Sequence, residues 1–113
     1  MKNRDSSILK HILEYCDKLQ EFTRGMDFEA FDSSDLHKSA CALCILQIGE
    51  LVINLTDEFK EEYSSIPWRK IRSMRNILAH HYGIVDSGIV WSTIQQEIPK
   101  LKEFCEERLA NPD

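Results

Sequence analysis

The sequence predicts an all-α protein, an up-and-down bundle of four to five helices. Apolar residues recur at intervals of three and four along four segments, and no segment shows the alternation of a strand. Turn-forming residues separate these segments. With 113 residues, of which 42% are hydrophobic and 29% charged, the chain is expected to form a single domain, 1–113, around one core.

The first helix is expected from about Arg4 to Thr23, with Gly25 as its stop. Its apolar residues follow helical spacing at Ile8, Ile12, Tyr15, Leu19 and Phe22. The connector at 26–32 carries two aromatic residues, which we expect to pack on the core.

A long second helix is expected from a cap at Ser33, Ser34 or Asp35 to about Glu61. Its centre is apolar around most of its circumference, which predicts burial from more than one side. In a chain of this size, a partner subunit is the expected second cover.

Two residues interrupt the apolar pattern of this helix. Gly49 costs about 1 kcal/mol relative to Ala in a helix, so we expect another element to approach closely there. Glu50 is expected to be a structural partner for a basic residue; alternatively, it is a carboxylate in a dimer groove that positions an Arg.

The third helix is expected to start at 64–67, with a Ser cap and Pro in the first turn, and to run to His80 or His81. Its core-facing residues are expected to be Trp68, Ile71, Met74 and Leu78.

A fourth helix is expected after Gly83, with a cap at Asp86 or Ser87. Pro99 lies inside its apolar pattern, which predicts a kink or two abutting helices.

Charge is unevenly distributed. The net charge is −5, yet 69–75 holds four of the 14 Lys and Arg residues, a patch able to bind a backbone phosphate. We expect no signal peptide, and the apolar run at 40–55 is shorter than the ~20 residues of a membrane span. A cytoplasmic protein with no membrane partner is therefore predicted.

The four Cys residues are expected to be reduced thiols. Cys41 and Cys44 have Cys-x-x-Cys spacing, but they lie in an apolar helix. A zinc site would need two more ligands, and the candidates are dispersed single residues: Cys16, Cys105, His11 and His37. Buried thiols are favoured over a zinc site or a redox motif, and no metal or cofactor is predicted.

The candidate catalytic residues lie near the end of the third helix. Arg72, Asn76 and His80 form a polar stripe, and Arg75 lies beside it, about 140° from His80 on a regular helix. Arg75 and His80 converge only if the helix loosens near His80 or if a second copy contributes its own residues. The alternative is a solvated basic face with a His favoured by the helix dipole.

Arg fits phosphate geometry and His exchanges protons near neutral pH. RNA cleavage by the neighbouring 2′-hydroxyl needs a base, an acid and positive charge on the phosphorane, and requires no metal. A two-fold dimer would supply two copies of Arg75 and His80 across one groove. The predicted function is therefore that of an endoribonuclease.

The motif Arg75-x4-His80-x-Tyr82 resembles the signature of HepT toxins in the HEPN superfamily. The resemblance extends to Ile48-Gly49-Glu50, to the segment 66–76 and to the last helices, and covers the chain from about Leu9 to Leu109. The residue between His and Tyr is often acidic in the family, and here it is His81.

This resemblance implies a HEPN-like homodimer that acts as a metal-independent endoribonuclease toxin. Arg75 and His80 would be catalytic, supported by Asn76 and by Arg72 on the same stripe. A neighbouring nucleotidyltransferase antitoxin of the MntA type would transfer AMP from ATP to Tyr82 and block the RNA groove.

Two other functions fit a helical dimer. The chain could be a non-catalytic subunit that holds a substrate or nucleotide for a minimal nucleotidyltransferase, or a structural bundle that only docks a partner. Arg75, His80 and the basic patch favour the enzyme.

Overall fold

The computed structural model describes residues 1–81, 83 and 86–111, and no strand occurs among them. Within this part of the chain, the long helices are α1 (Asn3–Thr23), α3 (Asp35–Ile53), α5 (Trp68–His81) and α7 (Ile98–Ala110). Shorter elements connect them: α2 (Phe28–Asp32), α4 (Asp57–Glu62), α6 (Ser87–Ser92) and the π-helical turn η2 (Thr93–Glu97). The predicted all-α bundle is confirmed.

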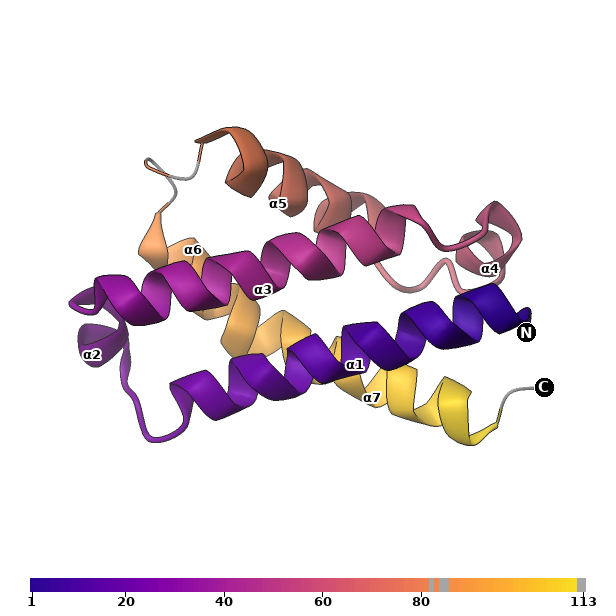
Figure 1. Ribbon diagram of the computed structural model, residues 1–113, viewed down its shortest axis with the longest axis horizontal. Coiled ribbons are helices and arrows are strands. Elements are labelled where there is room, and N and C mark those ends of the chain that lie inside the picture. Colours follow the sequence, from indigo (N-terminus) through magenta and orange to yellow (C-terminus); the bar gives the residue numbers. More distant parts are fainter. Residues whose placement is uncertain (82, 84–85, 112–113) are drawn as a thin grey trace.

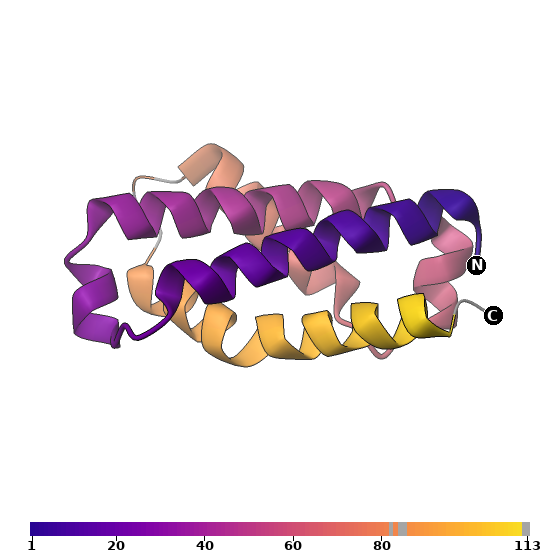
Figure 2. The ribbon, with the colours of Figure 1, turned by 60° about the horizontal axis from the view of Figure 1, so that its bottom comes forward.

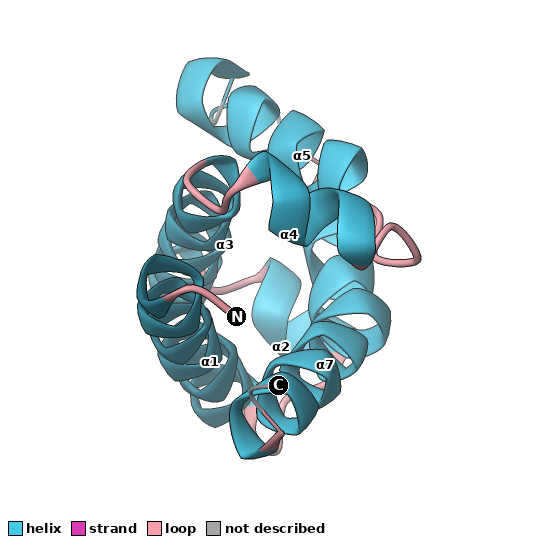
Figure 3. Cartoon of the chain, turned by 90° about the vertical axis from the view of Figure 1, so that its right-hand side faces the viewer, coloured by secondary structure: helices cyan, strands magenta, loops and turns pink. Residues whose placement is uncertain are grey.

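Helix α3 is central, with α1 packed on one side and α5 on the other (Figure 1). Helix α7 packs along α1, and the start of α1, the end of α7 and α4 lie at one end of the molecule (Figure 2). Seen end-on, the four long helices surround one interior (Figure 3). By length and composition alone α3 could cross a membrane, but an apolar core helix passes the same test.

The core stripe of α1 differs slightly from the predicted one. Thr23 is buried, whereas Phe22 is 38% exposed. The buried face of α1 is rotated slightly from the predicted one, and its residues follow the alternating three- and four-residue spacing of a single helix face. They are Asp5, Leu9, Ile12, Cys16, Leu19 and Thr23.

The second helix ends at Ile53, so its predicted extension to Glu61 is wrong. Thr56 caps a new helix, because its Oγ1 accepts a hydrogen bond from the Phe59 N–H at 3.2 Å. Asp5 holds Thr56 in place by accepting from its N–H at 2.9 Å and from its hydroxyl at 2.7 Å. This tie to α1 turns the chain before α4 begins.

The connector at 26–32 contains a short helix, α2, which was not predicted. Asp27 caps it by accepting from the Ala30 N–H at 2.9 Å. Phe31 is fully buried and anchors α2 to the core, as expected of this segment. Phe28 is 39% exposed and contacts the ring of Trp91 edge-on, with 6.4 Å between centroids.

The interruption predicted near Pro99 is present. The π-helical turn ends at Glu97, and α7 starts with Pro99 in its first turn, where a missing N–H costs nothing. The last part of the chain is thus α6, a π-turn and α7 in direct succession.

Candidate functional site

Helix α5 presents the two faces that its sequence predicts. Trp68, Ile71 and Met74 are half-buried against the core, and Leu78 is buried. The predicted polar stripe, comprising Arg72, Asn76 and His80, is exposed. The hydrophobic side of α5 therefore fixes the helix on α3, and the polar side is open to a ligand.

Gly49 is the point where α5 comes closest to α3. A Cβ atom at this position would lie 2.2 Å from the Cβ of Arg75 and 2.8 Å from its Cγ, which no real side chain tolerates. The close approach expected from the glycine is confirmed, and the approaching group is the stem of Arg75. The missing side chain of Gly49 thereby seats the guanidinium against the next residue of α3.

That next residue is Glu50, which holds the Arg75 guanidinium. Nε of Arg75 donates to Oε1 of Glu50 at 2.5 Å, and Nη2 forms an ion pair with the same oxygen. Nη1 donates to Oδ1 of Asn76 at 2.9 Å. These contacts use at most three of the five N–H donors of an arginine, so two remain for an anion.

The Arg75 side chain remains accessible, with 26% of its surface exposed, and Glu50 is 40% exposed. Of the two roles considered for Glu50, the structure shows the pairing with a basic residue, and that residue is the predicted catalytic Arg. Since a charge-assisted contact fixes the guanidinium plane, Glu50 fixes the orientation of the Arg75 side chain.

His80 does not converge with Arg75 within this chain. Helix α5 stays α-helical to His81, so the loosening considered near His80 does not occur. The two side chains therefore remain about 140° apart around the helix. His80 and His81 are both exposed in the last turn of α5.

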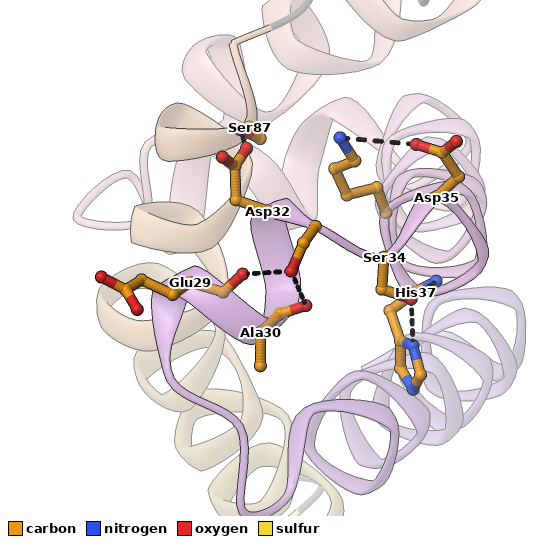
Figure 4. A network of polar contacts seen from close by, with 9 residues as sticks. Glu29, Ala30, Asp32, Ser34, Asp35, His37 and Ser87 are labelled. Atoms are coloured by element: carbon orange, nitrogen blue, oxygen red, sulfur yellow. Dashed lines mark hydrogen bonds and ion pairs between the residues drawn. The ribbon is translucent and has the colours of Figure 1, made fainter.

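Polar contacts hold the chain at the start of α6, and Figure 4 draws the one between Ser87 and Asp32. Asp86 caps α6 by accepting from the Gly88 N–H at 2.7 Å, as predicted, and the Ser87 hydroxyl donates to Asp32 of α2. Tyr82 lies outside the described residues, so its predicted modification stays a prediction.

The predicted cap of α3 is also present in this view. Ser34 accepts from the His37 N–H at 3.2 Å, and its hydroxyl contacts the His37 ring at 2.6 Å (Figure 4). His37 is thus held at a helix end, away from the polar stripe of α5.

All four Cys residues are buried free thiols, as the sequence predicts. Burial raises the pKa of Cys41 to about 11 and that of Cys105 to about 12, and it also raises the pKa of Cys16 and Cys44. Thiolates are the reactive form, so these groups are poor nucleophiles at neutral pH.

The four cations of the basic patch at 69–75 have three different surroundings, which the sequence did not indicate. Arg75 pairs with Glu50, and Lys70 donates to Glu97 of η2 at 3.3 Å. Arg69 and Arg72 have no acidic partner within ion-pair distance in the part of the chain that the structure describes. They are the cations of the patch left for another molecule.

Fold and site together define a class: a small helical bundle that presents an oriented arginine and an exposed histidine on one helix. This combination suits acid–base chemistry at a phosphodiester. The chain belongs to the HepT-like ribonuclease family, because the family model described as "Ribonuclease HepT-like" matches residues 12–108. The family resemblance inferred from the sequence is confirmed.

Individual relatives agree with this assignment. The chain is 41% identical to "Putative RNase TTE0752" of Caldanaerobacter subterraneus subsp. tengcongensis, over 89% of this chain and 90% of the relative. It is 35% identical to "Probable ribonuclease HepT" of Thermococcus cleftensis, over 90% and 93% of the two chains. No solved structure matches the chain.

Proposed function

We propose that this protein is the toxin of a toxin–antitoxin system, a metal-independent endoribonuclease that cuts RNA in the groove of a homodimer. The observation that carries the proposal is the arrangement on α5 in a member of the HepT-like family. Glu50 orients Arg75 with two donors left over, and His80 is exposed further along the same helix.

Cleavage follows from these groups without a metal ion. One His80 removes the proton of the 2′-hydroxyl, and the 2′-oxygen attacks the adjacent phosphorus. The bond from phosphorus to the 5′-oxygen breaks, and a protonated His80 of the partner subunit gives its proton to that oxygen. The products are a 2′,3′-cyclic phosphate and a 5′-hydroxyl. Arg75 stabilises the negative charge of the phosphorane.

The need for both an acid and a base supports a dimer, because each subunit offers one His80. Exposed apolar residues mark a suitable face: Leu36 is 77% exposed, Leu43 57% and Ile77 46%. Leu36, Leu43 and Glu50 follow each other at seven-residue intervals on α3, which places them on one face. A second copy covering this stripe would reach the pair of Glu50 and Arg75.

Control by a partner forms the second part of the proposal. A nucleotidyltransferase of the MntA type would position ATP so that the Tyr82 oxygen attacks the α-phosphorus. The phenol loses its proton, pyrophosphate leaves and AMP stays on Tyr82. Because Tyr82 is two residues from His80, the added phosphate would repel RNA and its bulk would block the groove.

The test compares wild type with Arg75→Ala and His80→Ala for cleavage of an RNA oligonucleotide in EDTA. Both variants should lose at least about 100-fold in rate, and the product should end in a cyclic phosphate. His81→Ala, an exposed neighbour, is the matched control and should stay active. Equal rates in wild type and both variants would contradict the proposed roles and favour a non-catalytic binding subunit.

Regulation is tested separately by intact-mass measurement after incubation with the partner and ATP. Wild type should gain the mass of AMP, and Tyr82→Phe should not. If the Phe variant still gains AMP, the modified residue is elsewhere.

A further inference from the structure

A basic hollow lies at the start of α5, away from His80. Lys60 of α4, together with Arg69 and Arg72 of α5, lines a space of about 540 Å³. The end of α3 and the turn before α5 form its remaining walls. No described residue of this lining is acidic. Its size is in the range of known ligand sites, and its charge is positive.

The cations of this hollow are poorly neutralised. Arg69 and Arg72 are exposed and have no acidic partner among the described residues. Among the described residues, the acidic partner of Lys60 is Asp57, at 3.9 Å, and the Asp57 side chain is 92% exposed. Like charges three positions apart on a helix repel each other. A bound anion would remove this repulsion for Arg69 and Arg72.

The hollow and His80 share one side of α5, whereas Arg75 points to another side of the helix. Arg69 and His80 are eleven residues apart, which is about three turns and a difference of only about 20° around the helix. The corresponding distance along the axis is about 16 Å. A single RNA strand carries one phosphate per ~3.4 Å when its bases are stacked, and fewer phosphates per ångström when it is extended. About three to five nucleotides would therefore span the distance from Arg69 to His80.

We propose that Lys60, Arg69 and Arg72 form a phosphate subsite for the RNA backbone about three to five nucleotides from the bond that is cut. This inference rests on the proposed function and adds positioning residues to it. Because phosphates are the same in every nucleotide, the subsite strengthens binding without reading sequence. Its other consequence is that a short RNA reaches the catalytic residues without filling the hollow.

The test measures binding of fluorescent RNAs of 12 and 3 nucleotides to protein carrying His80→Ala, which keeps the RNA intact. Adding Arg69→Gln and Arg72→Gln should weaken 12-mer binding about tenfold, for every sequence tried. The slope of log affinity against log salt should fall by about 1.4, or about 0.7 for each lost contact. Arg69→Gln alone should weaken binding of the 12-mer while leaving binding of the 3-mer unchanged, so the preference for the longer RNA should shrink.

Lys70→Gln is the matched control, since it removes a neighbouring charge that faces Glu97 instead of the hollow. It should leave the salt slope of 12-mer binding unchanged. If the double variant and Lys70→Gln have the same slope, the subsite does not exist, even where wild type cleaves RNA. If the slope falls as expected but wild type does not cleave, the subsite stands and the ribonuclease proposal fails.

Discussion

Two carboxylates join distant parts of this chain in different ways. Asp5 of α1 is 1% exposed and accepts two hydrogen bonds from Thr56. Glu50 of α3 remains 40% exposed and holds Arg75, whose guanidinium is still accessible. The first contact is closed to solvent and to other molecules, and the second leaves donors unused.

The difference separates stability from function. A buried carboxylate with both oxygens bonded can contribute only to folding, because no ligand can reach it. A partly exposed pair contributes little to stability, but it can orient a cation for an incoming anion. We therefore expect Asp5 variants to unfold easily and Glu50 variants to fold normally with reduced activity.

The largest effect is expected from Gly49→Ala, because it affects stability and the site together. The new Cβ would overlap the stem of Arg75, and separating α3 from α5 should cost about 3 kcal/mol, partly offset by about 1 kcal/mol of helix propensity. Urea unfolding and RNA cleavage should both show the loss. Gly83→Ala, whose Cβ would meet no atom within 4 Å, should cost far less stability. Equal stability of the two variants would refute the close packing.

Asp5→Ala tests the buried side of the comparison. It leaves the Thr56 N–H and hydroxyl without their acceptor, which should lower the free energy of unfolding by about 2 kcal/mol. Cleavage measured well below the melting temperature should be unchanged. Asp35→Ala, at a fully exposed carboxylate, is the control and should be nearly neutral. A loss of activity in folded Asp5→Ala would show that the two carboxylates do not divide the roles.

Glu50→Gln tests the exposed side. The amide keeps the shape but weakens the contact with Arg75, so kcat should fall about tenfold, or about 1.4 kcal/mol. Unfolding free energy should change by less than about 1 kcal/mol. Glu103→Gln on α7 is the control and should leave both quantities unchanged. Full activity of Glu50→Gln would mean that Arg75 needs no orientation by this carboxylate.

The buried thiol of Cys105 extends the comparison of Asp5 and Glu50 to a buried titratable group that holds no other residue in place. Burial raises the pKa of Cys105 to about 12, from 9.0. Between these values the unfolded state releases a proton that the folded state keeps, so stability is full below pH 9 and falls as pH rises. At pH 9.5 the loss from this thiol should be on the order of 1 kcal/mol. Urea unfolding of wild type and Cys105→Ala at pH 7 and 9.5 should show it as a smaller pH effect in the variant.

Local sequence patterns were sufficient to predict most of the helices, two of their caps and the family. The spacing of apolar residues predicted the helices, including both faces of α5, because a helix places every third or fourth residue on one side. Side-chain caps close to their helices were equally readable, as at Ser34 and Asp86. The motif Arg75-x4-His80-x-Tyr82 indicated the family because it is a short run of consecutive positions.

Only the tertiary structure decided where the second helix ends and what the charges do. The stop at Ile53 depends on Asp5, which lies 51 residues from Thr56 in the sequence. Likewise, one stretch of similar cations became an oriented Arg75, a paired Lys70, and Arg69 and Arg72, which have no acidic partner in the described part of the chain. The acidic partners of Arg75 and Lys70 come from other helical elements. A local pattern specifies which face a side chain occupies, but packing determines which distant group lies opposite that face.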